Sequence, residues 1–477
     1  MNSVYVVKYS MAYKIVKRKT KHGIQVSIVL HKDSKSSFVK TVGTAKDEFQ
    51  LNTLLLEAYS KIDSLEGNLW STLNTNQDLK PIKLEGYKVE KMICRKLYSE
   101  LSKHFDFVIS NPVNPLFRDL CILRITDPKS KKESVELLKD LFDLDYSLDQ
   151  IYYLKTLMKD SKDLITTQVV RSLSQNMFSL VFYDVTTVYF ESFTEDDLRK
   201  CGFSKDNKFN QPQLIIGLLV NIQGIPLDYE LYEGNTFEGH TFIPSIKHFV
   251  DKYSIKDLTV VADAAMMSKV TFKELEDSNL KYVIGARLAN LESSILQSIN
   301  TNFIKSENNT IRIKKLVVHY SLTRARKDRS DRLKQIERAE KRLSKPTNKS
   351  VKFLKKLSKD EYVMNTELIT KSEQLEGLKG YYTNLELSDL EIVSIYSNLW
   401  KIEHNFRITK TDLALRPIFH FKEEGIKFHL LICFVALAIS RKIEIEYKCS
   451  IKRYVQGLIK EREVTFKNLS TNQSYII

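Results

Sequence analysis

Paired cysteines are missing from this chain of 477 residues. Its five cysteines are scattered without a C-x-x-C pair, and its nine histidines show no metal-ligand spacing. The sequence therefore predicts neither a zinc site nor a disulfide framework, which fits a reducing cytoplasm. The first ten residues carry no small-residue cleavage site after an apolar core, so we expect no secretory signal.

Long hydrophobic runs are missing as well. The most apolar segment in the later part of the chain, residues 428–440, is too short to span a bilayer and is followed by Arg441 and Lys442. We therefore expect a buried helix at this segment and no membrane partner.

Acidic residues are scarce relative to basic ones. The chain has 59 Asp and Glu against 74 Lys and Arg, a formal net charge of +15. Between Arg312 and Lys359 there are 18 basic and 4 acidic residues, and 18 − 4 gives +14 for this segment alone. A basic segment can be a nucleic-acid-binding surface or simply a charged helix face exposed to water. Because so few acids are available to pair with these lysines and arginines, the nucleic-acid interpretation is favoured. Basic proteins also bind membranes and ribosomes, so charge alone does not decide.

The first third of the chain changes in character once. Residues 1–45 contain short runs rich in β-branched and aromatic residues, typical of strands. Helical spacing follows, as at Leu51, Leu55 and Ala58, and dominates to residue 175. The sequence therefore predicts an N-terminal β region and a helical domain over 46–175, which is a candidate reader of DNA ends.

At residue 178 the pattern turns to buried strands. An apolar run over 178–190 contains Asp184, and a second apolar strand ends at Asp263. The elements over 176–287 follow the order β-β-β-α-β-α-β. This order predicts an α/β fold, a mixed sheet flanked by helices.

The rest of the chain is expected to form three parts. Residues 288–385 interrupt the pattern and hold the basic stretch, so they are predicted to be an inserted subdomain. Residues 386–445 return to helical spacing and are predicted to complete the core. Residues 446–477 form a short basic tail.

Three side chains of different chemistry recur at one spacing near the end of the core. Tyr396, Glu403 and Lys410 are seven residues apart. Seven residues are close to two helical turns, so all three are predicted to lie on one stripe of one helix. A phenol, a carboxylate and an amine in a row suit a metal ion beside a phosphate.

Three carboxylates are expected to meet: Asp184, Asp263 and Glu403. A charged residue in an apolar strand costs several kcal/mol unless it is paired or binds a cation. Carboxyl ends of strands are also where open α/β sheets place their sites. Each acid alone has a simpler explanation, since aspartates cap turns and helical glutamates are usually solvated. Together they favour a site for two Mg²⁺ ions, with Mn²⁺ as a substitute.

The sequences around these acids resemble a known family. Phe-Tyr-Asp184-Val-Thr-Thr, Val-Val-Ala-Asp263-Ala-Ala-Met-Met and the segment from Tyr396 to Lys410 resemble the three acidic motifs of bacterial insertion-sequence transposases of the DDE class. The last segment is similar to the subgroup pattern Tyr-x2-Arg-x3-Glu-x6-Lys, with Leu399 at the position of the arginine. Lys401 or Arg407 is a substitute for that arginine.

This resemblance covers about 178–440 and implies an RNase H-like core with an insertion before the helix that carries Glu403. It implies that the three acids hold the metal ions. Trp400 has two readings, a stacking platform for an unpaired base or a core residue, and Arg407 pairs either with Glu403 or with phosphate. The residues that the resemblance places at DNA are Tyr396, Lys410, Arg407 and Trp400.

The resemblance implies a cut-and-paste DNA transposase in the bacterial cytoplasm, associated with the nucleoid. Such an enzyme binds terminal inverted repeats as a homodimer, cuts to free a 3′ hydroxyl and joins it to target DNA. One alternative is an RNase H-like nuclease without strand transfer, which would use the same acids. Another alternative is a DNA-binding protein whose RNase H-like core is catalytically inactive. The presence of all three acids disfavours this alternative.

Overall fold

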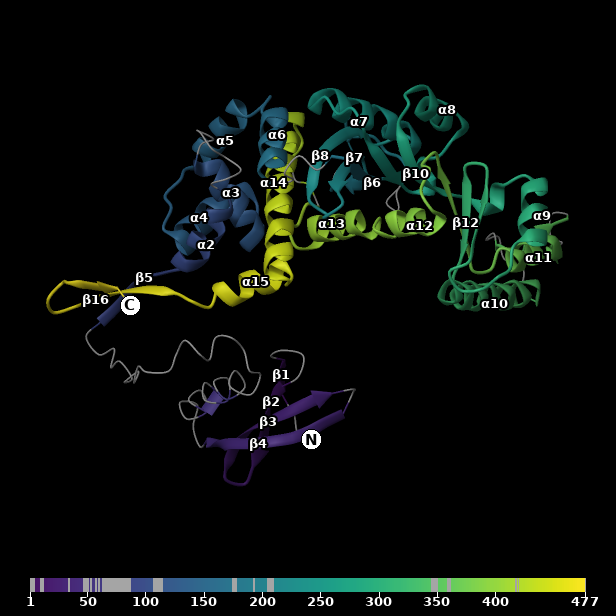
Figure 1. Cartoon of the computed structure of the whole chain (residues 1–477). Coiled ribbons are helices and arrows are strands. Elements are labelled where there is room, and N and C mark those ends of the chain that lie inside the picture. The colour runs from purple at the N-terminus through teal and green to yellow at the C-terminus, as the bar shows by residue number, and fades with distance from the viewer. Residues whose placement is uncertain are drawn as a thin grey trace. The chain divides into compact units, whose positions relative to one another are not determined.

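The computed structural model divides the chain into two compact units, Met1–Gly86 and Tyr87–Ile477 (Figure 1). The structure describes the following residues: 5–8, 13–32, 35–45, 51, 54, 55, 58, 61, 87–105, 115–173, 178–191, 194–203, 210–344, 351–357, 362–416, 418 and 420–476.

The first unit contains an antiparallel sheet of four strands in the order β1-β2-β3-β4. Its core joins Ile15, Val26 and Ile28 of the sheet to Ala58, which is helical. The predicted strands are confirmed, and most of the helical pattern predicted to follow residue 45 in this unit lies outside the described residues. The strands are β1 (Tyr5–Lys8), β2 (Tyr13–Thr20), β3 (Gly23–Lys32) and β4 (Lys35–Ala45).

The second unit is built on a mixed sheet of eight strands in the order β11-β12-β15-β10-β9-β6-β7-β8. Strand β9 pairs in parallel with β6 and with β10, and the other pairs are antiparallel. The predicted mixed sheet flanked by helices is confirmed (Figure 1). Its strands are β6 (Leu180–Tyr189), β7 (Gln213–Asn221), β8 (Pro226–Glu233), β9 (Thr259–Ala262), β10 (Lys281–Ala286), β11 (Thr310–Ile313), β12 (Leu316–Tyr320) and β15 (Leu378–Thr383).

Helices cover both faces of this sheet. Alternate residues of a strand point to opposite faces, so Tyr183 of β6 packs under one set of helices and Phe182 under the other. The face of Tyr183 is covered by α7 (Glu238–Tyr253), and α8 (Lys269–Asp277) packs against α7. The face of Phe182 is covered by α12 (Asp389–Ser397), α13 (Trp400–Thr411) and α14 (Glu423–Tyr447).

Helix α14 joins the sheet to the helical region that precedes it. The apolar residues 428–440 predicted as a buried helix lie inside α14 and are buried, which confirms that prediction. Among the described residues, no helix is long and apolar enough to cross a membrane. The helices that complete this side are α2 (Arg95–Phe105), α3 (Pro115–Thr126), α4 (Lys131–Phe142), α5 (Leu148–Leu157) and α6 (Lys162–Leu173).

The tail and the start of the helical region pair with each other. Strand β5 (Tyr87–Ile93) forms a three-stranded sheet with β16 (Glu463–Asn468) and β17 (Ser474–Ile476). Helix α15 (Ile451–Leu458) leads into this sheet. Sequence spacing identified neither partner, because strand pairing over such a separation leaves no local signal.

The segment predicted as an insertion shares the main sheet rather than forming a separate one. Strands β11, β12 and β15 extend that sheet beyond β10. The segment also has its own apolar cluster, in which Phe303 packs with Val318 and Leu378. Its remaining elements are α9 (Ser293–Asn302), α10 (Leu322–Ser344), β13 (Leu354–Lys356), β14 (Tyr362–Met364) and α11 (Thr366–Gln374).

Candidate functional site

Two of the predicted acids lie on neighbouring parallel strands. In the register of β6 and β9, Tyr183 is opposite Ala262, so one further residue sets Asp184 beside Asp263. Adjacent strands are about 4.8 Å apart. Asp184 is two residues from Phe182 and Asp263 is two residues from Val261, and both of these pack on the face under α12–α14. Strand alternation therefore places the two carboxylates on that face of the sheet.

Asp263 does not use its carboxylate to cap the turn that follows it. It is the N-cap residue of a 3₁₀ turn over Ala264–Met266, yet it makes no side-chain capping bond. Its Oδ1 atom instead accepts a hydrogen bond of 3.1 Å from the hydroxyl of Tyr396. The capping explanation for this aspartate is therefore wrong.

A glycine makes room for that hydroxyl. Gly285 of β10 follows Ile284, which pairs with Ala262, so Gly285 is the next neighbour of Asp263 across the sheet. A Cβ atom at Gly285 would lie 2.6 Å from the hydroxyl oxygen of Tyr396 and 2.9 Å from the backbone nitrogen of Ala264. The approach of Tyr396 to Asp263 thus requires glycine at this position.

The predicted single helix is divided in two. Tyr396 lies on α12, whereas Glu403 and Lys410 lie on α13. Between them, the N–H groups of Leu399 and Ile402 bond three residues back rather than four, the tighter spacing of a 3₁₀ turn. Asn398 favours this break, because its side-chain amide bonds the carbonyl of Ser394 and such local bonds compete with helix.

A lysine that the sequence analysis did not single out acts on both Asp263 and Glu403. Lys379 lies on β15, and its ammonium is 4.4 Å from the ring centroid of Tyr396. Burial lowers the pKa of Lys379 and Arg324 lowers it further, while the charges of Asp263 and Glu403 oppose that shift. Lys379 therefore connects the two acids electrostatically.

Tyr396 is held as a hydrogen-bond donor. Its side chain is 4% exposed. Burial raises the pKa of its phenol, and the charge and hydrogen bond of Asp263 and the charge of Asp184 raise it further. The hydroxyl therefore stays protonated and orients the carboxylate of Asp263.

The remaining predicted residues of this segment have different environments. Trp400 is 54% exposed, so its interpretation as a core residue is wrong. Leu399 is buried, and the ammonium of Lys401 donates to the carbonyl of Ile222. Arg407 is exposed and bonds the imidazole of His404. Lys410 is partly exposed in the last turn of α13.

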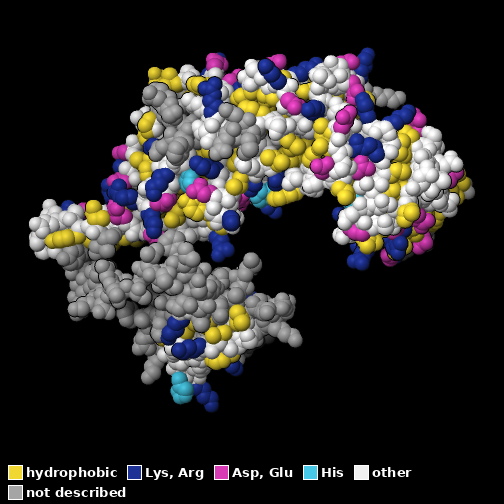
Figure 2. Space-filling model, viewed as in Figure 1, with side chains coloured by type: hydrophobic (Ala, Val, Ile, Leu, Met, Phe, Trp, Pro, Cys, Tyr) yellow, Lys and Arg dark blue, Asp and Glu magenta, His cyan; other side chains and the backbone are white. Residues whose placement is uncertain are grey.

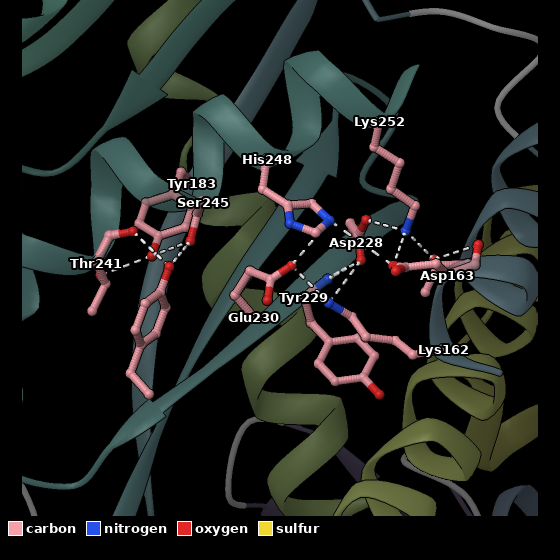
Figure 3. Close-up of polar contacts among 12 residues, drawn as sticks. Lys162, Asp163, Tyr183, Asp228, Tyr229, Glu230, Thr241, Ser245, His248 and Lys252 are labelled. Carbon is pink, nitrogen blue, oxygen red and sulfur yellow. Dashed lines mark hydrogen bonds and ion pairs between the residues drawn. The ribbon is translucent and has the colours of Figure 1, made fainter. Parts of the chain in front are cut away.

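A second group of acids lies closer together than the predicted three. Among the described residues, Asp163, Asp228 and His248 form the single group of three potential ligands whose atoms all lie within 4.8 Å of one another (Figure 3). Lys252 donates to Asp163 at 2.7 Å and to Asp228 at 2.8 Å. Burial alone would lower the pKa of Lys252, but these carboxylates outweigh it and raise that pKa. A lysine therefore already neutralises this group.

About half of the predicted basic segment is the helix α10. Arg332 and Arg329 pair with Glu376, at 2.6 Å and 2.8 Å, so part of its charge is structural. Lys327, Lys334 and Arg338 are exposed at spacings that share one side of the helix. On the face drawn in Figure 2, Lys and Arg side chains lie among hydrophobic and acidic ones rather than in a continuous field.

Lys379 and Gly285 were missed because of where they lie in the sequence. Lys379 is in the segment assigned to an insertion, although the alternation of 378–383 is that of a strand and places Lys379 with Tyr381 on one face. Gly285 lies in an apolar strand, where an interior glycine often indicates close backbone approach. Both signals are present in the sequence.

Comparisons with known proteins give one family match and low similarity to solved structures. The chain is similar to the piggyBac transposase in a synaptic complex with hairpin DNA, at 11% identity over 77% of this chain and 76% of that one, with a TM-score of 0.40. It is also similar to the protein in a pre-cleavage Mos1 transpososome, at 12% identity over 35% of this chain and 57% of that one, with a TM-score of 0.16. No curated protein sequence matches the chain. The family model described as the transposase DDE domain matches residues 176–439, more than half of the chain, and the chain belongs to that family.

Proposed function

We propose that this transposase cuts DNA at the ends of a mobile element and joins the freed strand to target DNA. Asp184, Asp263 and Glu403 are the acids that carry this chemistry. The supporting observation is the parallel register of β6 and β9, which sets two carboxylates side by side under the helix that carries the third.

The donor chemistry of the three acids suits a divalent cation, and in this structure their ligand atoms do not all lie within 4.8 Å of one another. Mg²⁺ and Mn²⁺ prefer hard oxygen ligands, and Mg²⁺ keeps positions open for water and phosphate. Among the described residues, neither Asp263 nor Glu403 forms an ion pair with a lysine or arginine, so both remain available as ligands. Two such ions, when bound, stabilise the attacking and leaving oxygens of an in-line displacement at phosphorus.

The neighbouring residues orient and support the acids. Tyr396 donates to Asp263 and fixes the direction of its carboxylate, as hydrogen-bonding partners of metal ligands commonly do. Lys379 offsets the mutual repulsion of Asp263 and Glu403 when no metal is bound. Arg407, Lys410 and Trp400 lie on or near the same helix and contact DNA close to the cut.

DNA is held along its backbone by basic side chains. The exposed lysines and arginines of α10 supply phosphate contacts that carry no sequence information. Binding is therefore expected to weaken steeply with salt, because each neutralised phosphate releases counterions. Bringing two terminal inverted repeats together requires a homodimer on the DNA.

The test is strand cleavage and joining of DNA that carries the terminal repeats, with Mg²⁺ or Mn²⁺. We expect Asp263→Ala and Glu403→Gln to bind this DNA as the wild type does and to lose at least 100-fold in cleavage rate. Cleavage that is unaffected by either change would remove the proposed site. Cleavage without any joined product would favour the nuclease alternative.

A further inference from the structure

A cavity of about 300 Å³ lies between the start of α4, the helix α5 and the start of α14. Its walls hold three lysines and a histidine, and no Asp or Glu is among the described residues that line it. Aromatic side chains complete the walls. We call this the cationic pocket, and its polar residues are Lys131, Lys155, Lys422 and His420.

Lys131 is buried there without a compensating acid. It is 8% exposed, and it forms no hydrogen bond or ion pair with any described residue. Its ammonium lies 5.5 Å from the ring centroid of Phe428. Burial and the like charge of Arg124 lower the pKa of Lys131 to about 7, against the opposing effect of the thiols of Cys433 and Cys121.

The surroundings of His420 show the same excess of positive charge. Burial, together with the charges of Lys131, Arg124 and Lys155, lowers the pKa of this imidazole to about 4. The acids at the start of α14 are engaged elsewhere, since Glu423 pairs with Lys427 at 2.6 Å and Glu424 with Lys159 at 3.1 Å.

An uncompensated buried cation is costly, and a bound anion removes that cost. The anion that suits this pocket also has a flat apolar part, because Tyr152, Phe421 and Phe428 supply ring surfaces beside the lysines. Lysine binds phosphate as a point charge, and bases stack on aromatic rings whatever their identity. A volume of about 300 Å³ is at the small end of ligand sites, the size of one nucleotide.

We propose that the cationic pocket binds one nucleotide of a DNA strand, with its phosphate at Lys131 and Lys155 and its base against the aromatic walls. This inference rests on the proposed function, because it names a further contact with the same DNA. The pocket is separate from the three acids. Phe421 stacks on Arg199, which stacks on Phe190, and Phe190 is six residues beyond Asp184, about 20 Å along the strand.

The chain offers a matched pair of variants for the test. Lys131→Met removes the buried ammonium, and Lys132→Met removes an exposed one from the next position of the same helix. With full-length protein and a short fluorescent single-stranded oligonucleotide, Lys131→Met is expected to weaken binding about tenfold. It is also expected to reduce the salt slope by about one phosphate, roughly 0.7 in log–log units. Lys132→Met is expected to leave the affinity within twofold, and equal affinities of the two variants would overturn the proposal.

Two further experiments support the test: alternative variants of the pocket, and small competing ligands. If Lys131→Met does not fold, Lys155→Gln and Phe421→Ala are expected to weaken oligonucleotide binding in its place, and wild-type affinity in both would overturn the proposal.

Deoxyadenosine monophosphate and inorganic phosphate are tested as competitors. Lys131-dependent binding of the mononucleotide but not of the oligonucleotide would refute a DNA strand as the ligand. If the wild type binds no DNA of any kind, the proposed function fails; if it binds and cleaves but Lys131→Met equals Lys132→Met, only the pocket fails.

Discussion

Two groups of acids lie on the second unit, and they differ in what surrounds them. Asp184 and Asp263 lie beside each other on parallel strands, and within the described part of the chain Asp263 accepts a side-chain hydrogen bond only from the neutral phenol of Tyr396. The ligand atoms of Asp163, Asp228 and His248 all lie within 4.8 Å of one another, and the ammonium of Lys252 bonds both carboxylates (Figure 3).

The contrast shows that carboxylates can lie close together and still be occupied by a lysine rather than available to a metal ion. Asp228 is 1% exposed, and the side chain of Lys252 is 10% exposed. A cation entering this group would have to displace a buried lysine whose pairing already offsets the cost of burying both charges. At the other group, Lys379 acts on two acids from a distance and leaves their oxygens available.

The largest expected effect is on the free energy of unfolding, which should respond differently to replacing an acid of each group. Asp228→Asn removes the buried carboxylate that pairs with Lys252 and Lys162, and leaves Lys252 with the exposed Asp163 and Lys162 with Glu230. Part of the buried positive charge then lacks its partner, so we expect about 3 kcal/mol less free energy of unfolding. Asp263→Asn removes an exposed charge and is expected to change that free energy by less than about 0.5 kcal/mol. Urea denaturation of both variants measures the difference. Equal losses would mean that the two groups play the same structural part.

Metal binding gives the second contrast. Mn²⁺ titrations followed by electron paramagnetic resonance are expected to lose at least tenfold in affinity with Asp184→Asn, because a ligand is removed. Asp163→Asn is expected to leave Mn²⁺ affinity unchanged. The reverse result would move the metal site to the group around Lys252.

Much of this arrangement was predictable from the sequence. Asp184 and Asp263 lie in register because each follows an apolar segment, and these two segments pair as parallel strands. Such apolar segments can be recognised in the amino-acid sequence. The strand that carries Lys379 was predictable, but its place next to β10 was not, because that strand joins the sheet after a long intervening segment. The lysine partners of Asp228 come from α6 and α7, and no local spacing reports contacts between elements so far apart in the chain.

A substitution at Gly285 tests the role of the hydrogen bond from Tyr396 to Asp263. Gly285→Ala places a Cβ atom 2.6 Å from the hydroxyl of Tyr396, so the phenol must move away from Asp263. We expect cleavage to fall about tenfold, as for other groups that orient metal ligands. Gly457→Ala is the control, because a Cβ there meets nothing within 4 Å. Wild-type cleavage by Gly285→Ala in a folded protein would show that this hydrogen bond does not matter.

The smallest expected effect concerns pH. Burial opposes ionisation of Asp163, but the hydrogen bond and charge of Lys252 outweigh it, so the pKa of Asp163 is below its usual 3.8. A lowered pKa in the folded state adds stability above about pH 3.8, and this stability is lost as the pH falls through the folded-state value. Because the side chain of Asp163 is 61% exposed, screening limits the contribution to less than about 1 kcal/mol. Melting temperatures of the wild type and Asp163→Asn should therefore converge at low pH and differ by a few degrees near neutrality. A difference that grows on acidification would show that Lys252 does not stabilise this carboxylate.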